Sequence, residues 1–292
     1  MNMSDSNTTI DKKSLVICVG CYAMWGSLAA YWQLLRGVDP LLVLCARIVF
    51  SFAFSAILLG ITRSVKLFIG TLLDKTRIIW LIPASVLITI NYGIYIWAVN
   101  SAHVVESSLG YYINPLIVFL LGVLLFREKF TRMQFVAVVL AFVGVLISVI
   151  AYGVFPFISF GLALTFAAYG AIKKKANVDP LSGIAIEALL ITPFALAFAL
   201  VFRMDGISAL SAAEAVLMVL SGVVTATPLV LYSRSVNHIP FYVVGFAQYV
   251  SPSILLVYGI LSGETLTMAQ LISFVFIGLG LIVFSIAMVK NK

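Results

Sequence analysis

Charged residues are scarce in this sequence, at 10% of its 292 residues, whereas 63% of the residues are apolar. Soluble domains carry about 25% charged residues, so this composition excludes a soluble globular domain. What the chain has instead is a succession of apolar runs of about 20 residues, each long enough to cross ~30 Å of hydrocarbon as a helix. The sequence therefore predicts a polytopic membrane protein.

Cysteine and histidine are also rare, at three and two residues. Cys18, Cys21 and Cys45 fall inside apolar runs, where no oxidant reaches them and no hydrophilic ligands surround them. His103 and His238 fall in separate loops, far apart along the chain. We therefore expect no disulfide bond, no metal site and no other cofactor.

Ten apolar runs follow one another, and we expect every one to be a helix. Backbone groups in hydrocarbon must be hydrogen-bonded within the chain, which leaves helices and closed barrels, and these runs lack the alternating polarity of barrel strands. The predicted fold is an all-α polytopic membrane protein with ten transmembrane helices, at residues 15–35, 41–61, 78–99, 104–126, 135–151, 156–172, 181–202, 213–232, 241–261 and 268–289.

The basic residues that give the chain its net charge of +7 are distributed unevenly between its loops. With ten helices, 15 of the 18 lysine and arginine residues lie on one side of the membrane; Arg36 and Arg203 lie on the other side, and Arg47 lies inside a helix. Cytoplasmic loops are enriched in lysine and arginine, so we expect both termini in the cytoplasm of a protein in the inner or plasma membrane. The lipid bilayer explains this charge, so we expect no nucleic-acid partner, and we expect a functional monomer.

The second half of the sequence repeats features of the first half in the same order. The segment VDPL at residues 38–41 returns at residues 178–181, an offset of 140. Further matches, at offsets of 136 or 137, join Tyr112 to Tyr249, Pro115 to Pro252, Gly122 to Gly259 and Gly144 to Gly280. We infer two copies of a five-helix unit, at residues 15–151 and 152–289, between cytoplasmic tails at residues 1–14 and 290–292. Because five is odd, the second copy must be inverted, as in alternating-access transporters.

Two prolines at equivalent positions interrupt apolar runs near the middle of the membrane. Pro115 and Pro252 each remove a backbone donor and free a carbonyl group, which needs a partner or a wet cavity at that depth. Proline is also a common kink in membrane helices, but paired interruptions with neighbouring amides favour a central cavity. The predicted solute-binding residues are Trp25, Asn91, Tyr111, Asn114, Gln248 and Tyr249.

Several of these segments carry a resemblance to a known family. SLGYYINPL at residues 108–116, IWAVN at 96–100, YGAIKKK at 169–175 and GFAQYVSP at 245–252 resemble the RarD-type branch of the EamA transporters, within the drug/metabolite transporter superfamily. The resemblance extends over nearly the whole chain. It implies ten helices in two five-helix halves, a central solute path, and transport of small metabolites or drugs.

Two charged residues lie inside predicted helices, at equivalent positions of the two halves. Arg47 and Glu187 are separated by 140 residues, and each lies about 10 Å from one end of its helix at 1.5 Å per residue. A charge at such depth is costly unless it is paired or wet, so both are candidates for gating or coupling. The alternative is that each reaches water or a structural partner near its own membrane face. We do not expect the two to pair directly, because inversion puts them near opposite faces.

The sequence favours a secondary transporter, an exporter or facilitator of small organic metabolites or drugs that alternates access around a site between the repeats. A membrane-embedded enzyme is the first alternative, but the chain has no H-E-x-x-H motif, no paired carboxylates inside a helix and no phosphate-binding glycine loop. A receptor or assembly factor without transport activity is the second alternative. The chain has little mass outside the membrane to form a partner surface for such a role.

Overall fold

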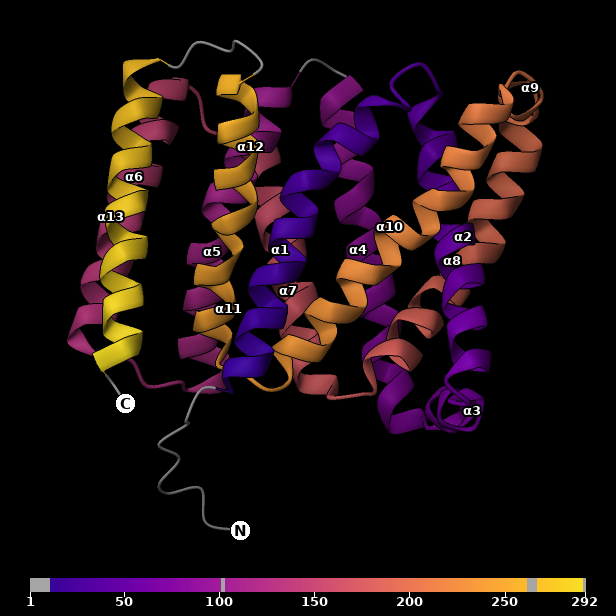
Figure 1. The fold of residues 1–292 in the computed structure, drawn as a ribbon, viewed down its shortest axis with the longest axis horizontal. Helices are drawn as coiled ribbons and strands as arrows, with labels where there is room; N and C mark the ends of the chain where they lie inside the picture. Colours follow the sequence, from indigo (N-terminus) through magenta and orange to yellow (C-terminus); the bar gives the residue numbers. More distant parts are fainter. Residues whose placement is uncertain (1–10, 101–102, 262–266, 291–292) are drawn as a thin grey trace.

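The computed structural model describes residues 11–100, 103–261 and 267–290. Every regular element in these residues is a helix (Figure 1). The helices are α1 (Lys12–Gln33), α2 (Pro40–Ile61), α3 (Val65–Leu73), α4 (Lys75–Asn100), α5 (Val104–Phe126), α6 (Arg132–Tyr152), α7 (Phe157–Ala176), α8 (Pro180–Phe202), α9 (Met204–Ser208), α10 (Ala212–Val236), α11 (Phe241–Gln248), α12 (Val250–Leu261) and α13 (Met268–Lys290).

Eight helices of the described chain are long and apolar enough to cross a membrane, namely α1, α2, α4, α5, α6, α8, α10 and α13. The prediction of an all-α, multi-pass membrane protein is therefore confirmed. The two remaining predicted spans correspond to α7, which carries three lysines in its last turn, and to the successive short helices α11 and α12.

The repeated VDPL segment marks the start of a helix in each half. Asp39 and Asp179 are the N-cap residues of α2 and α8, and a proline follows each as the first helical residue. The Asp39 carboxylate accepts hydrogen bonds from the backbone N–H groups of Leu41 (2.8 Å) and Leu42 (3.0 Å), and Asp179 accepts one from Ser182 (2.9 Å). An acidic cap followed by proline satisfies the free N–H groups of a first turn, so the same short signal starts both helices.

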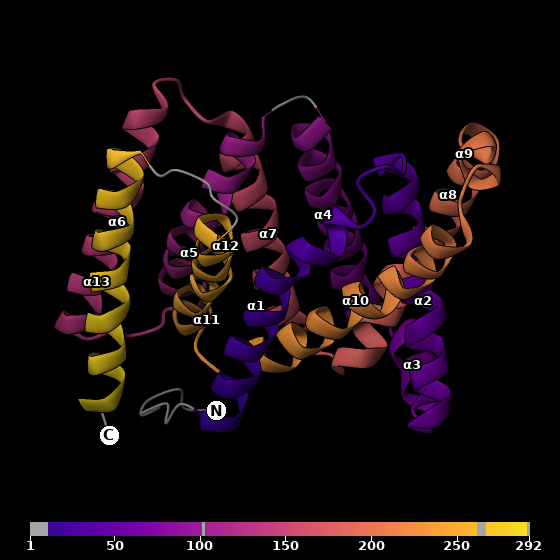
Figure 2. The ribbon, with the colours of Figure 1, turned by 45° about the horizontal axis from the view of Figure 1, so that its top comes forward.

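The main contacts between long helices recur when the two halves are exchanged. The first-half helices α1, α2, α4, α5 and α6 then correspond to α7, α8, α10, the α11–α12 pair and α13. Helix α5 contacts α7, and its counterpart α12 contacts α1. Helix α4 contacts α7 and α8, and its counterpart α10 contacts α1 and α2. Figures 1 and 2 show α6 beside α13 at one end of the bundle, and α2 near α8 and α10 at the other. Such pairing is expected of a duplicated unit.

Two glycines at equivalent positions bring α6 and α13 close together. A Cβ atom on Gly144 would lie 2.8 Å from the carbonyl oxygen of Ser273, and one on Gly280 would lie 2.8 Å from the carbonyl oxygen of Ala137. The same offset of 136 relates both pairs, so each contact becomes the other when the halves are exchanged. Helices in lipid gain no hydrophobic free energy by associating, and close packing at small residues holds them together instead.

We expect Gly280→Ala to lower the melting temperature of the purified protein in detergent. The added methyl group would meet a backbone oxygen, so α6 and α13 must separate, and overpacking of this kind costs ~1–3 kcal/mol. The matched control is Gly278→Ala in the same helix, where a Cβ would meet nothing within 4 Å. Equal melting temperatures for the two variants would contradict this packing of α6 against α13.

Candidate functional site

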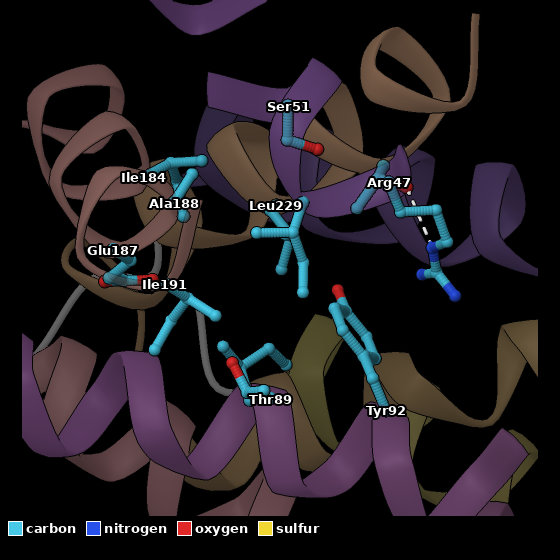
Figure 3. A pocket seen from close by; sticks show the side chains of 12 residues that line it. Arg47, Ser51, Thr89, Tyr92, Ile184, Glu187, Ala188, Ile191 and Leu229 are labelled. Carbon is cyan, nitrogen blue, oxygen red and sulfur yellow. Dashed lines mark hydrogen bonds between the residues drawn. The ribbon is translucent and has the colours of Figure 1, made fainter. Parts of the chain in front are cut away.

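Four helices, two from each half, surround a cavity of about 40 Å³ (Figure 3). A cavity of this size holds roughly three water molecules. Helices α2, α4, α8 and α10 form it, with apolar walls of Ile48, Ile88, Ile184, Ala188, Ile191 and Leu229 and polar walls of Arg47, Ser51, Thr89, Tyr92, Glu187 and Thr225. Among the described residues, no cluster of histidine, cysteine and acidic side chains could hold a metal ion.

The two charged candidates, Arg47 and Glu187, line this same cavity. Helices α2 and α8 occupy equivalent places in the two halves, and the residues lie on opposite sides of the cavity in Figure 3. They do not pair with each other, since each has other partners. Equivalent positions of the two halves therefore face the same cavity.

Aromatic rings and a hydroxyl group surround the guanidinium of Arg47. Its Nε donates a hydrogen bond to Thr225 Oγ1 (3.1 Å), and its Cζ atom lies 4.4 Å from the ring centres of both Trp32 and Tyr92. No carboxylate in the described part of the chain lies within ion-pair distance of it. Desolvated cation–π contacts contribute ~2 kcal/mol or more, which offsets part of the cost of a charge at this depth. The charge of Arg47 is thus stabilised but not neutralised.

The carboxylate of Glu187, in contrast, is neutralised by partners from α7. Lys173 Nζ donates to Glu187 Oε1 at 2.6 Å, and the Tyr169 hydroxyl donates to Oε2 at 3.1 Å. All three side chains are buried. The pair therefore fastens α7 to α8 beside the cavity.

The next lysine, Lys174, belongs to a second polar cluster at the end of α7. Its Nζ lies 2.6 Å from the carbonyl oxygen of Ile239 and 3.4 Å from Glu128 Oε1. The Glu128 carboxylate also accepts hydrogen bonds from the backbone N–H groups of Phe241 (2.6 Å) and Tyr242 (3.0 Å), the first two residues of α11. A carboxylate is favourable at a helix N-terminus, so this cluster holds the start of α11 against the end of α7.

The predicted site residues Asn91 and Asn114 are both hydrogen-bonded to α7. Asn91 Nδ2 donates to the carbonyl oxygen of Leu162 and to Thr165 Oγ1, each at 2.9 Å. Asn114 Nδ2 donates to the carbonyl oxygen of Ala163 at 2.7 Å, while its Oδ1 has no hydrogen-bond partner among the described residues. In this conformation the two amides tie α4 and α5 to α7.

Tyr111 lies close to the surroundings of Arg47. Its ring centre is 6.3 Å from that of Tyr95, and Tyr111 is 42% exposed. Tyr92, Tyr95 and Tyr111 all interact electrostatically with Arg47. Tyr111 and Arg47, to which the sequence assigned different roles, therefore lie in one region, although Tyr111 is not among the residues that line the cavity.

Trp25 and Gln248 lie in a separate, tightly packed region. Trp25 has the rings of Tyr22, Phe166 and Tyr232 around it, with centres at 5.2, 5.7 and 5.8 Å. Gln248 lies beside Tyr22, and in the described part of the chain neither its amide atoms nor the Tyr22 hydroxyl has a hydrogen-bond partner. These residues are not among those that line the cavity.

The two prolines have different effects on their helices. Helix α5 continues through Pro115, whereas the equivalent segment divides into α11 and α12 at Tyr249, three residues before Pro252. Proline kinks a helix without necessarily ending it, so both outcomes are compatible with the same residue. Helices α5 and α11 pack directly on each other, since a Cβ on Gly245 would lie 2.8 Å from the carbonyl oxygen of Pro115. A solute site between them stays a prediction.

Sequence comparison assigns the chain to a family through both of its halves. The EamA-like transporter family matches residues 12–150 and again residues 155–286. The chain belongs to the EamA-like transporter family. The predicted resemblance is confirmed, and this membership points to a transporter rather than an enzyme.

Relatives of the chain carry transporter or RarD names. The uncharacterized transporter YojE of Bacillus subtilis is 37% identical over 96% of both chains. Protein RarD of Escherichia coli is 32% identical over 94% of both chains, and protein RarD of Streptomyces exfoliatus is 39% identical over 82% of this chain and 78% of its own. One solved structure, described as a crystal structure of a protein, shares the fold at a TM-score of 0.73 and 15% identity, over 94% of this chain and 98% of the other.

Several residues in the cavity lining or in contact with it were not predicted from the sequence. Tyr92 adjoins the predicted Asn91, but a single tyrosine in an apolar run does not by itself indicate a binding site. Trp32 is not among the predicted site residues, yet its ring lies over Arg47. Thr225 and Lys173 gave no signal, because a threonine in an apolar run and a lysine in a run of lysines are both ordinary.

We expect Lys173→Met to lower the melting temperature in detergent, because removing one partner of a buried ion pair costs about 3–5 kcal/mol. The control is Lys175→Met, two residues away on the same helix, where the side chain is exposed over the ring of Trp80. The double variant Lys173→Met, Glu187→Leu should regain much of the loss, since no uncompensated charge remains. A Lys173→Met variant as stable as Lys175→Met would contradict the pairing with Glu187.

Proposed function

We propose that this protein is a secondary transporter that exports small organic metabolites or drugs, or lets them equilibrate, across the cell membrane. The observation that carries the proposal is the cavity between α2, α4, α8 and α10, because each half supplies two of its helices. A cavity shared by both halves can open to either side of the membrane when one half rocks against the other.

The proposed topology is ten crossings, as two inverted five-helix repeats with both termini in the cytoplasm. Figure 1 shows α7 and the successive helices α11 and α12 running from one face of the bundle to the other, as the long apolar helices do. The start of α1 and the end of α13 lie on the same face, which requires an even number of crossings. The excess of lysine and arginine in the loops of that face favours the cytoplasmic side.

Equivalent positions in the two halves differ in exposure, which supports alternating access. Tyr111 is 42% exposed, while Gln248, 137 residues later, is 5% exposed. Tyr95 is partly exposed, while Tyr232, at the same offset, is fully buried. If the two halves exchange their conformations, Tyr111 closes and Gln248 opens. We propose that this exchange moves the solute, along a path flanked by Trp25, Asn91, Asn114 and Tyr249.

Transport itself is tested by comparing the medium of cells that overproduce the protein with that of cells that lack it. We expect at least one small organic solute to accumulate in the medium with the wild-type protein and not with Ala188→Leu, because the larger side chain would fill a cavity of about 40 Å³. The matched control is Ala197→Leu, at an exposed position of the same helix, which should transport normally. Identical solute profiles for wild type and deletion would contradict the transport function.

Cysteine labelling tests which half of the protein is open, and to which side of the membrane it opens. In a background without Cys18, Cys21 and Cys45, we expect Tyr111→Cys to react with a membrane-impermeant maleimide added to intact cells. Tyr111 lies two turns from the start of α5, and α5 starts on the face opposite to the start of α1.

Gln248→Cys is the counterpart in the other half. It should react slowly in intact cells and faster in inverted vesicles under conditions that favour the exchanged conformation. Rapid labelling of Gln248→Cys in intact cells, with none of Tyr111→Cys, would overturn both the orientation and the assignment of the open side.

A further inference from the structure

One of the two charges that border the cavity is not neutralised by any described residue. Glu187 is paired with Lys173 at 2.6 Å, whereas Arg47 has no carboxylate within ion-pair distance among the described residues. The described lining, counted with Lys173, therefore carries a net positive charge. A charge at this depth is costly, so an anion that enters the cavity would be stabilised there.

The donors around Arg47 suit a small planar anion. Its Nε donates a hydrogen bond to Thr225, and no carboxylate of the described residues lies within ion-pair distance of the guanidinium. The hydroxyl group of Tyr92 points into the cavity in Figure 3. A guanidinium matches a carboxylate with two parallel hydrogen bonds, and a hydroxyl group can add a third.

The charge of the lining limits the charge of the ligand. One arginine balances one negative charge, and the described lining offers no second unpaired cation for another. A cation would meet Arg47 and would find the Glu187 carboxylate already bonded to Lys173 and Tyr169. The lining therefore favours a monoanion over a dianion or a cation.

The size and the walls of the cavity describe the rest of the ligand. A space of about 40 Å³ accepts a head group and little more. The body of a larger solute would lie against the apolar side chains of the lining, such as Ile88 and Leu229, and against the rings of Tyr95 and Tyr111. Apolar and aromatic walls with a few polar groups are typical of sites for organic solutes.

We propose that the solute is an organic monocarboxylate whose head group binds Arg47 and whose apolar or aromatic body lies against the isoleucine, leucine and tyrosine side chains. The inference deepens the proposed transport function and rests on it for the route through the membrane. Binding can be measured without transport, so the two can fail separately.

The first measurement compares the head group of otherwise similar probes. The full chain in lipid nanodiscs is titrated with carboxylates from acetate to 3-phenylpropionate, with 3-phenylpropionamide, with 3-phenylpropylamine and with the dianion of phenylphosphonate. We expect 3-phenylpropionate to bind about 10- to 100-fold more tightly than the amide, because hydrogen bonds between charged groups are stronger than those to a neutral group. The amine should bind more weakly still. Equal binding of carboxylate and amide, or tighter binding of the amine or of the phosphonate, would overturn the proposal.

The second measurement removes the charge. Arg47→Gln should weaken binding of 3-phenylpropionate about 10- to 100-fold and leave binding of the amide unchanged. Arg47→Lys should retain part of the affinity, because it keeps the charge without the bidentate geometry. The matched control is Arg36→Gln in the exposed loop before α2, which should bind as the wild type does.

Folding of the variants is checked by size-exclusion chromatography. If Arg47→Gln does not yield folded protein, Arg47→Lys and Thr225→Val decide, since both should weaken carboxylate binding and leave amide binding intact. A folded variant that binds the carboxylate as tightly as wild type overturns the role of Arg47.

Flux measurements separate this inference from the transport function. Solute flux that is equally fast for Arg47→Gln and wild type, and equally fast for acids and their amides, would overturn the monocarboxylate and leave transport standing. Carboxylate binding that depends on Arg47, in a protein that moves no solute across proteoliposome membranes, would retain the binding site and contradict transport.

Discussion

Hydrocarbon offers a buried charge neither water nor a counter-ion, and this constraint organises the polar residues inside the bundle. Two charged side chains show two different solutions. Glu187 is neutralised by Lys173 and also accepts a hydrogen bond from Tyr169, while Arg47 is held by the rings of Trp32 and Tyr92 and by one hydroxyl group. The charge of Glu187 is thus balanced by a lysine, whereas Arg47 keeps its positive charge beside a cavity.

The same solvent explains why backbones come so close together in this fold. Apolar side chains gain nothing by leaving lipid for another helix, so association depends on close van der Waals contact and on hydrogen bonds between helices. Gly144 and Gly280 provide this contact between α6 and α13, and Gly245 provides it against Pro115. Asn91 and Asn114 add hydrogen bonds to carbonyl oxygens of α7. Small residues and amides thus hold the helices of this bundle together, as large apolar residues do in the core of a soluble protein.

The long apolar helices were predictable from the sequence because a membrane span is a local property of about 20 residues. The short helices α3 and α9 were not predicted. The equivalence of Arg47 and Glu187 was predictable too, since it follows from the repeat alone. Contacts between helices were not, because they depend on which faces meet. The sequence placed Lys173 in a run of lysines at a membrane face, yet its side chain lies between α7 and α8 and reaches Glu187. The residues selected for their nearness to Pro115 and Pro252 are not among those that line the cavity of α2, α4, α8 and α10, and a kink alone does not determine what each helix face packs against.

The opposite charges of Arg47 and Glu187 have a consequence for the cavity between them. In a perfect duplicate both positions would hold the same residue, and two like charges facing one space would repel. Opposite charges bring another risk, because direct pairing would draw α2 and α8 together and close the space. Lys173 prevents this by holding Glu187 from the side of α7, and Figure 3 shows the two charged side chains apart. In the proposed transporter this arrangement leaves Arg47 available to a ligand, because a counter-ion within the protein would compete with every anionic ligand. Aromatic rings are suitable partners for Arg47, since a cation–π contact can persist while the edge of the guanidinium binds an anion.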